Sequence, residues 1–304
     1  MTTPDADPAS PTPPIDAAGL SAVLEAAVQV GLRSTVRVDA RARHGATGIV
    51  WDTDLVLTAD HVLERDEDIS IIRSDGVACV AQIAGRDPGL DLAVLRVPGL
   101  ELAPATQAAA PRLGQLVLAL GRGSGDGATM GIVAEIAFGR RWRRGSFPGG
   151  YLRPDLTMYP GFSGGPLVDA HGHLLGMNTT RFGGMPMTVP SASLASISAQ
   201  ILAHGRLRRA WLGLRGQHAE LPGELAGLVG QSHGLVVIGV DPDSPAAVSG
   251  VQVGDILTNV SGQAIHDSDD LRLLLTALPS GEAVTLTLLR GGSRLQVDAT
   301  LGER

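Results

Sequence analysis

Three polar residues that lie far apart in the sequence have the types needed for catalysis by an activated serine. They are His61, Asp91 and Ser163. A serine hydroxyl is a weak nucleophile until an adjacent base takes its proton, and an imidazole base needs a third group to fix its tautomer. The sequence therefore predicts Ser163 as nucleophile, His61 as general base and Asp91 as the residue that orients His61. Asp60 adjoins His61, but neighbouring side chains in an extended segment point to opposite sides, so Asp91 is preferred.

The segment around the serine is the most specific of these signals. Ser163 lies in the run Gly-Phe-Ser-Gly-Gly-Pro from Gly161 to Pro166, where glycines leave room for a substrate. The backbone N–H groups of Gly161 and Ser163 are predicted to form an oxyanion hole. The order His, Asp, Ser along the chain is that of chymotrypsin-like hydrolases, whereas subtilisins and α/β-hydrolases arrange the same residues in other orders.

The composition indicates a globular protein. The chain has 304 residues, of which 44% are hydrophobic, enough for two or three domains with cores of their own. The net charge of −7 argues against nucleic acid as the main partner. Cys79 is the only cysteine, so no intrachain disulfide can form. Because it lies in an apolar, strand-like run, it is predicted to be a small buried hydrophobic residue.

The N-terminal segment, residues 1–15, is rich in proline and poor in large apolar residues, which predicts disorder. It has neither the basic start nor the apolar stretch of a signal peptide. The chain contains no run of 18 apolar residues, so no membrane span is expected. As the sequence stands these features predict a cytoplasmic protein, and an exported protein if the start is misassigned.

The pattern of apolar residues predicts the elements that must position the three polar residues. Residues 16–30 favour a helix capped by Asp16. Between residues 34 and 188, short β-branched runs alternate with Gly, Pro and Asp, which is typical of a barrel or sandwich. We expect a pair of six-stranded barrels with the triad at their junction. The runs predicted as strands are 34–38, 48–51, 55–58, 69–72, 80–83, 93–97, 116–120, 131–136 and 174–178.

The remaining residues predict a helix, a linker and a third folded unit. The helix covers residues 191–204, with Ser191 or Ser193 as its cap and Gly205 at its end. Residues 205–210 are arginine-rich and read as a linker. The unit that follows is expected to contain strands, a short helix after Pro245 and a second helix from about Ser268 to Leu278.

A series of short motifs covers nearly the whole chain after residue 16. They are Thr47–Val50, Leu57–Val62, Asp87–Leu95, Pro160–Val168, Gly176–Thr179, Val189–Ser191, Trp211–Leu214, Ser244–Ala247 and Gly254–Leu257. Together these motifs resemble the HtrA family of serine endopeptidases. The resemblance implies a mostly β protein, with a chymotrypsin-like double β-barrel and a C-terminal α+β PDZ domain. The implied divisions are a disordered segment at 1–15, a protease domain with an N-terminal helix at 16–204, a linker at 205–210 and the PDZ domain at 211–304.

The same resemblance implies a function. The protein would be an ATP-independent endopeptidase that cleaves unfolded or damaged proteins and needs neither a cofactor nor a metal. It would form a homotrimer through N-terminal segments, and its PDZ domain would bind C-terminal or extended peptides. A specificity pocket that favours a medium aliphatic residue would be lined by Thr157, Met177, Asn178 and Thr179. The carboxylate-binding loop of the PDZ domain would consist of Trp211, Leu212, Gly213 and Leu214.

Two departures from the family pattern fall in the loop of the nucleophile. Family members usually carry Asn where this chain has Phe162, and Ile-Asn-Pro-Gly where it has the run from Met158 to Gly161. Both changes lie in the loop that is expected to form the oxyanion hole, so they bear on the conformation of that loop in the absence of substrate. They keep an alternative function open, in which a catalytically weak or inactive protease fold serves as a PDZ scaffold or chaperone.

Other residue clusters in the sequence favour ordinary structural roles. The glycine-rich run at 121–127 has no following lysine, so a surface loop is preferred over a phosphate site. His171 and His173 could chelate a metal, but no further ligand is evident. Arginines 140, 141, 143 and 144 surround Trp142, which favours a solvated loop, with a regulatory role or nucleic-acid contact as alternatives.

Overall fold

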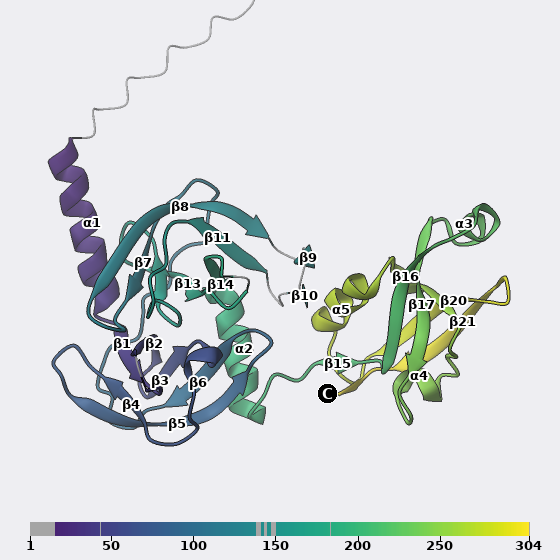
Figure 1. Ribbon diagram of the computed structural model, residues 1–304, viewed down its shortest axis with the longest axis horizontal. Coiled ribbons are helices and arrows are strands. Elements are labelled where there is room, and N and C mark those ends of the chain that lie inside the picture. Colours follow the sequence, from purple (N-terminus) through teal and green to yellow (C-terminus); the bar gives the residue numbers. More distant parts are fainter. Residues whose placement is uncertain are drawn as a thin grey trace, which may run out of the picture.

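The computed structural model describes residues 16–42, 44–137, 141–142, 145–146, 150–182 and 184–303. Two closed β-barrels lie side by side, and a third unit built on a β-sheet follows them in the chain (Figure 1). The predicted mostly β fold with two six-stranded barrels is therefore confirmed. The segment 1–15, for which the sequence predicts disorder, lies outside the described residues, as do the side chains of the arginine cluster around Trp142.

The first barrel carries His61 and Asp91. Its strands pair in the order β1-β2-β3-β6-β5-β4, each antiparallel to the next. Their bounds are β1 (Thr35–Asp39), β2 (Ala46–Asp52), β3 (Leu55–Thr58), β4 (Ile69–Ile72), β5 (Ala78–Asp87) and β6 (Leu92–Arg96). Alternate residues such as Val36, Val38, Ile69 and Ile71 point into the barrel and are fully buried. A short 3₁₀ turn, η1 (Asp60–Val62), follows β3 and presents His61.

The second barrel carries Ser163. Its strands pair in the order β11-β14-β13-β12-β7-β8. Their bounds are β7 (Leu116–Gly121), β8 (Gly127–Ala137), β11 (Tyr151–Asp155), β12 (Pro166–Val168), β13 (Leu174–Thr179) and β14 (Met187–Pro190). The segments β9 (Arg141–Trp142) and β10 (Gly145–Ser146) form a separate two-stranded sheet. The turn of the nucleophile therefore lies between β11 and β12.

A shared core holds the two barrels against each other. Leu57 and Leu92 from the first barrel belong to the same buried cluster as Met177 and Val189 from the second, and Ile197 adds the helix α2 (Ser191–His204). The predicted end of α2 is confirmed, because Gly205 adopts a left-handed conformation with φ of +74°. The predicted caps are wrong. Strand β14 runs directly into the helix, so Pro190 stands at the cap position and makes no side-chain hydrogen bond.

Helix α1 (Ala17–Leu32) leans away from the second barrel (Figure 1). Asp16 caps it as predicted, because its carboxylate accepts from the N–H groups of Ala18 and Gly19. Only its last turns pack on the protein: Ala27 and Leu32 are buried with Leu118, Leu120 and Val168. Leu20 and Val23, nearer the start of the helix, are exposed.

The third unit is a sheet with helices beside it. The sheet order is β16-β17-β18-β20-β21, with β19 (Gln263–Ala264) paired to β18, and β15 (Ala210–Trp211) pairs separately with β22 (Gly302–Glu303). The main strands are β16 (Leu214–Glu220), β17 (His233–Val240), β18 (Ile256–Val260), β20 (Ala283–Arg290) and β21 (Ser293–Thr300). The predicted helices are confirmed as α4 (Pro245–Val248) and α5 (Ser268–Ala277). The structure adds α3 (Gly223–Val229), whose two glycines weaken its helical pattern in the sequence.

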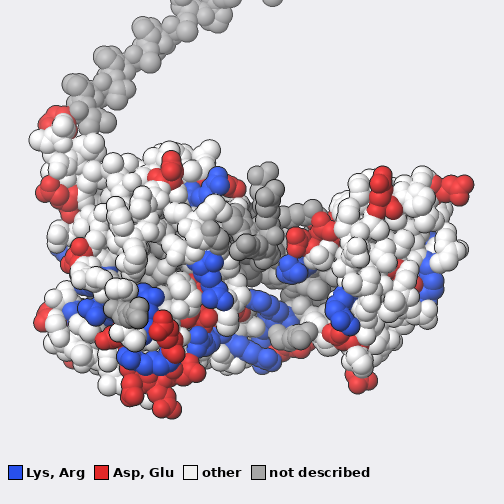
Figure 2. Space-filling view, viewed as in Figure 1, with Lys and Arg blue, Asp and Glu red and all other residues white. Residues whose placement is uncertain are grey.

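Basic and acidic side chains, blue and red in Figure 2, gather together over the lower part of the first barrel and toward the segment 205–210 that connects it to the third unit.

Cys79 is only half-buried, so the prediction of a buried residue is wrong; its strand lies with one side facing solvent, where Val80 is exposed. Among the described residues no helix is long and apolar enough to cross a membrane.

Candidate active site

The side chains of His61 and Asp91 meet at the edge of the first barrel. The Nδ1 atom of His61 lies 2.7 Å from Oδ2 and 2.9 Å from Oδ1 of Asp91. The backbone N–H of His61 donates to Oδ1 of the same carboxylate at 2.8 Å. Asp91 has no exposed surface, and its φ of +54° places it in the left-handed region that aspartate tolerates better than most residues. The carboxylate therefore fixes both the ring and the backbone of His61.

Asp91 receives a further hydrogen bond from the second barrel. Thr179, at the end of β13, donates its hydroxyl to Oδ2 of Asp91. Both residues are fully buried. A buried carboxylate must find its hydrogen-bond partners inside the protein, and the hydroxyl of Thr179 is one of them. Thr179 thus supports the orientation of Asp91 through its hydroxyl; its place in the specificity pocket stays a prediction.

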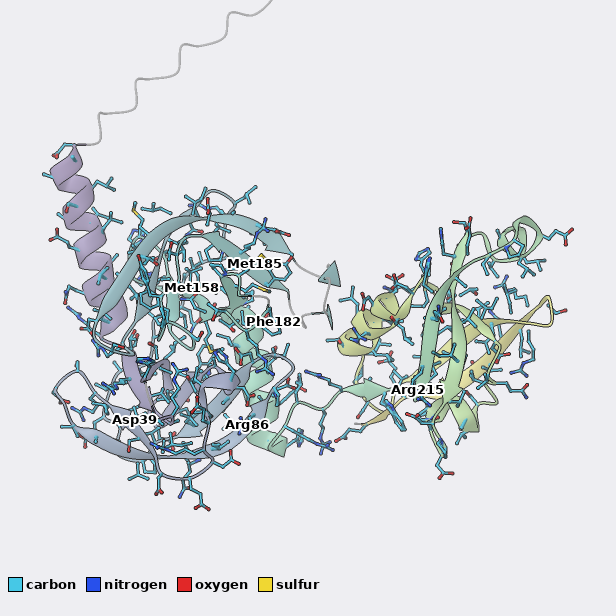
Figure 3. All side chains as sticks on the ribbon, in the orientation of Figure 1. Asp39, Arg86, Met158, Phe182, Met185 and Arg215 are labelled. Atoms are coloured by element: carbon cyan, nitrogen blue, oxygen red, sulfur yellow. The ribbon has the colours of Figure 1, made fainter. Side chains whose placement is uncertain are left out.

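Asp60 has a different partner. It forms an ion pair with Arg86 on β5, which also reaches Asp66 at 2.7 Å. The hydrogen bond with Asp60 raises the pKa of Arg86, although partial burial acts against this, and the charges of Asp60 and Asp66 add to the rise. Arg86 lies on the first barrel (Figure 3). The structure therefore places Asp91, and not Asp60, against the ring of His61.

Ser163 lies in the turn after β11 and is 7% exposed. Its Oγ atom is 3.2 Å from Oγ1 of Thr180. Within the described part of the chain, no hydrogen bond joins Ser163 to His61. Catalytic hydrogen bonds are often long or misaligned without substrate and tighten when substrate binds.

The loop that precedes Ser163 contains a tight turn, residues 159–162, that depends on a glycine. Phe162 N–H donates to Tyr159 O at 3.1 Å across a turn in which Pro160 comes second and Gly161, with φ of +94°, comes third. Proline followed by a residue with positive φ is typical of a type II turn. Among the described residues the N–H groups of Gly161 and Ser163 have no acceptor. Both predicted oxyanion donors are therefore available.

Phe162, the main departure from the family pattern, is a core residue. It is 6% exposed and belongs to the buried cluster of the second barrel. Its ring lies over Gly121 and Gly127, where a Cβ would come within 2.3 Å and 3.0 Å of ring atoms. The ring also meets Tyr159 edge to face, with centroids 6.0 Å apart. The aromatic side chain thus anchors the loop of the nucleophile by packing.

The four predicted pocket residues have different surroundings. Thr157 is exposed, and Met177 lies in the core shared by the two barrels. Asn178 is fully buried; its Oδ1 accepts from Thr188 at 2.8 Å, and its Nδ2 has no partner among the described residues. Thr179 is bonded to Asp91. Asn178 is therefore the residue of the four that is buried with an unused donor.

Three apolar residues that sequence reasoning did not assign lie near this region. Phe182 and Met185 lie on the side of the second barrel that is turned toward the third unit, and Met158 lies nearer the middle of that barrel (Figure 3). Met158 packs against the cluster of Phe162, and Phe182 packs against the shared core. Met185 is 39% exposed. Their spacing carries no periodic signal, which is why the sequence alone did not single them out.

The third unit contains a groove beside its edge strand. A cavity of about 370 Å³ lies between β16, which forms the edge of the sheet, and helix α5. Its apolar lining includes Leu214, Leu235, Leu271 and Leu275. Leu274, on the same helix, is buried in the core of this unit. An edge strand beside a helix is suited to binding an extended peptide.

The predicted carboxylate-binding loop leads into this groove. Trp211 pairs in β15, Leu212 is buried, and Leu214 begins β16. Gly213 adopts φ of +79°, and a Cβ on it would lie 2.1 Å from the Cβ of Ser244. Glycine is therefore required where the chain turns into the edge strand.

An ion pair joins the groove to the first barrel. Arg209, which lines the cavity, donates from Nη2 to both carboxylate oxygens of Asp87, at 2.8 and 3.0 Å. Asp87 Oδ1 also accepts from Leu90 N–H at 2.9 Å, in the turn that delivers Asp91. A Cβ on Gly89 would come within 2.8 Å of the guanidinium. Arg209, in the connecting segment 205–210, is thus linked to β5 of the first barrel.

The remaining clusters have local roles. His171 and His173 both donate their backbone N–H groups to Oδ1 of Asp169, and their rings stack with centroids 5.8 Å apart. Across the described ranges there is no group of three or more His, Cys, Asp or Glu residues that could hold a metal ion. In the glycine-rich run, Arg122 forms an ion pair with Asp126.

The fold and the site together define a class of protein: a two-barrel serine peptidase scaffold followed by a peptide-binding unit. Family models match the chain accordingly. The trypsin-like peptidase domain matches residues 46–177, and the PDZ domain matches residues 212–301. The chain belongs to the HtrA family of serine endoproteases.

Curated relatives and solved structures agree with this classification. The chain is 34% identical over 270 residues to a probable periplasmic serine endoprotease, DegP-like, of Pseudomonas putida, with 85% of this chain and 55% of the relative covered. It is 32% identical to the periplasmic serine endoprotease DegP of Escherichia coli, with 84% of this chain and 56% of the relative covered. The chain therefore spans about half the length of these relatives.

Two solved structures extend the likeness to the whole fold. An HtrA-type protease, AlgW, with a decapeptide has a TM-score of 0.77 and 26% identity, covering 92% of this chain and 98% of that one. A serine endoprotease from Yersinia pestis has a TM-score of 0.76 and 28% identity, with the same coverage. HtrA proteases with a PDZ domain are thus found with bound peptides.

The expected cytoplasmic location is wrong. The curated relatives are named periplasmic endoproteases, which points to an exported protein. The expectation depended on residues 1–15, in which no signal-peptide pattern is present.

Proposed function

We propose that this chain is a serine endopeptidase that works through an acyl-enzyme. The observation that carries the proposal is the contact between His61 Nδ1 and the buried carboxylate of Asp91, 2.7 Å apart, beside the glycine-rich turn of Ser163. A carboxylate in this position keeps the imidazole in the tautomer whose Nε2 can accept a proton.

The residues would act in a fixed order. His61 Nε2 takes the proton of Ser163 as Oγ attacks the scissile carbonyl carbon. The carbonyl oxygen becomes an oxyanion that accepts from the N–H groups of Gly161 and Ser163. The C–N bond then breaks, and His61 gives its proton to the leaving amine. Water, deprotonated by His61, attacks the acyl-enzyme and releases Ser163.

We further propose the substrate class and the role of the PDZ unit. The substrates would be unfolded or damaged proteins, whose extended segments can enter the junction of the barrels. The groove between β16 and α5 would bind C-terminal or extended peptides by strand addition, with the loop from Trp211 to Leu214 facing the terminal carboxylate. The relatives' names support export to the periplasm.

The proposed assembly is a homotrimer. The exposed apolar side chains of α1, Leu20 and Val23, support it, because the first turns of this helix project from the barrel without packing on it. A homotrimer would cover these side chains with equivalent segments of neighbouring copies. Sedimentation equilibrium of the intact chain, compared with Leu20→Glu and Val23→Glu, measures the assembly directly.

One observation favours a second candidate function. Ser163 Oγ points to Thr180 in this structure. A resting state of this kind fits a scaffold that binds peptides but cleaves slowly. The alternative is a catalytically weak or inactive protease fold acting as a PDZ scaffold or chaperone.

A fluorophosphonate probe separates the two candidates. It forms a bond to an activated serine and releases its leaving group, so it should label the wild type and leave Ser163→Ala unlabelled. Digestion of unfolded casein should be lost in Ser163→Ala and in His61→Ala, each by about 10⁴- to 10⁶-fold. An unlabelled wild type that still slows casein aggregation would favour the scaffold.

A further inference from the structure

The two proposed oxyanion donors depend on a residue from the other barrel. We propose that Thr47, on β2 of the first barrel, is a positioning residue for the oxyanion hole of the second barrel. The inference rests on the proposed endopeptidase function and assigns a role to a residue outside the triad. Thr47 has no exposed surface, so its polar groups must find partners inside the protein.

Thr47 forms two hydrogen bonds with the loop of the nucleophile. Its Oγ1 donates to Gly161 O at 2.6 Å, and its backbone N–H donates to Ser163 O at 3.3 Å. Its own carbonyl accepts from the hydroxyl of Thr58 at 2.8 Å, three residues before His61. One residue thus contacts the segments of the nucleophile and of the base.

The direction of the hydroxyl proton of Thr47 is fixed by a third contact. Arg122 N–H donates to Thr47 Oγ1 at 2.7 Å. A hydroxyl has one proton and can accept at its lone pairs. Because Arg122 already supplies a donor and Gly161 O can only accept, the proton of Thr47 lies on the bond to Gly161. Thr47 is therefore the donor in this hydrogen bond, and Gly161 O is the acceptor.

These bonds hold alternate peptide units of the loop. The unit joining Gly161 to Phe162 is held at its carbonyl by Thr47 and at its N–H by Tyr159 O, at 3.1 Å. The unit joining Ser163 to Gly164 is held at its carbonyl by Thr47 and at its N–H by Asn178 O, at 2.9 Å.

The two oxyanion donors belong to the adjacent units: Ser163 N–H lies on the unit between the two held ones, and Gly161 N–H on the unit just before the first, whose other neighbour is held through Tyr159 O. Each peptide unit is planar and turns as one plane, so hydrogen bonds to the units on either side restrict how far the N–H between them can rotate. Gly161 has no Cβ to resist rotation, so the bond from Thr47 adds a side-chain restraint to the backbone bond between Phe162 N–H and Tyr159 O.

Loss of the Thr47 hydroxyl should lower kcat and leave substrate binding unchanged. Thr47→Val keeps the shape and removes the hydroxyl, whereas Thr47→Ser keeps the hydroxyl. Removing an oxyanion donor outright costs about 10²- to 10³-fold in kcat, so misdirecting one should lower kcat by about 10- to 100-fold. We expect Thr47→Val to show this loss on a fluorogenic peptide with KM unchanged, and Thr47→Ser to stay close to wild type.

A peptide boronate supplies a readout that packing alone would not move. Its boron bonds to Ser163 and places an oxygen in the oxyanion hole, so its affinity should fall in Thr47→Val by the same factor as kcat. Thr258→Val is the matched stability control, because Thr258 is 1% exposed and donates to a backbone carbonyl, Thr287 O, in the PDZ unit. It should melt lower but keep wild-type kcat.

The outcomes are distinguishable. Equal kcat in wild type and Thr47→Val, equal losses in the valine and serine variants, or a rise in KM alone would refute the role of Thr47. If Thr47→Val does not fold, Thr47→Cys replaces it. Its thiol is a weak donor, so its kcat should lie between that of Thr47→Ser and the value, about 10- to 100-fold below wild type, that is expected without the hydroxyl. A wild type that does not react with fluorophosphonate would refute the proposed function itself.

Discussion

The contact between Phe162 and Gly121 offers a quantitative test of how the loop of the nucleophile is anchored. Gly121 ends β7 and pairs with Gly127 at the start of β8. A Cβ on Gly121 would lie 2.3 Å from Cδ1 of Phe162, closer than van der Waals contact allows. Gly121→Ala should therefore force the ring to shift and cost about 1–3 kcal/mol in the free energy of unfolding.

The opposite change leaves a cavity. Phe162 is 6% exposed, so Phe162→Ala removes a buried ring and should cost about 3–5 kcal/mol. In the double variant the new methyl group at position 121 enters the space that the ring has left. The two losses should then be less than additive, with a coupling of about 1–2 kcal/mol, within the range of contacting residues.

Calorimetric melting in a Ser163→Ala background measures these energies without self-digestion. The transition of the barrels should shift, while that of the PDZ unit should stay in place. Gly227→Ala is the matched control, because nothing lies within 4 Å of its Cβ position in α3. Additive losses in the double variant, to within about 0.5 kcal/mol, would show that the ring and the glycine are not the contact that anchors the loop.

Three further outcomes are expected. Thr179→Val removes one donor from the buried carboxylate of Asp91 and should lower kcat about 10-fold with KM unchanged, which steady-state kinetics would measure; an unchanged kcat would contradict the support we assign to this threonine. Burial alone would raise the pKa of Asp255, but its hydrogen bonds and the charge of Arg290 hold that pKa below its usual range. Because the folded-state pKa is lowered, this stabilisation is present above the unfolded value of about 3.9 and is lost as pH falls through the folded pKa. In Asp255→Asn the melting temperature of the PDZ unit should therefore fall less steeply with acidification than in the wild type. An identical pH dependence in the two proteins would argue against the pair. Gly213→Ala should weaken binding of a free C-terminal peptide while cleavage of short peptides continues, and calorimetry showing unchanged affinity would argue against a carboxylate site in that loop.

Local signals in the sequence were sufficient for the elements of the fold. Strands β3 (Leu55–Thr58) and β4 (Ile69–Ile72) have the bounds that their β-branched runs predict, and Gly205 ends α2 as its position indicates. These features depend on neighbours along the chain, so the sequence expresses them directly. The caps of α2 were wrong because a strand runs into that helix, which is a property of the sheet and not of the local residues.

The sequence by itself determined the residue types that can do the chemistry: a serine in a glycine-rich turn, a histidine after a predicted strand, and an aspartate just before another predicted strand. Tertiary structure decided how these residues are supported. Asp60 is bonded to Arg86, Thr179 is bonded to Asp91, and Thr47 holds Gly161 across the barrel junction. These partners are separated by 26, 88 and 114 positions. No local pattern encodes such pairs, because they arise only when two closed barrels pack on one core and their polar groups must be satisfied there.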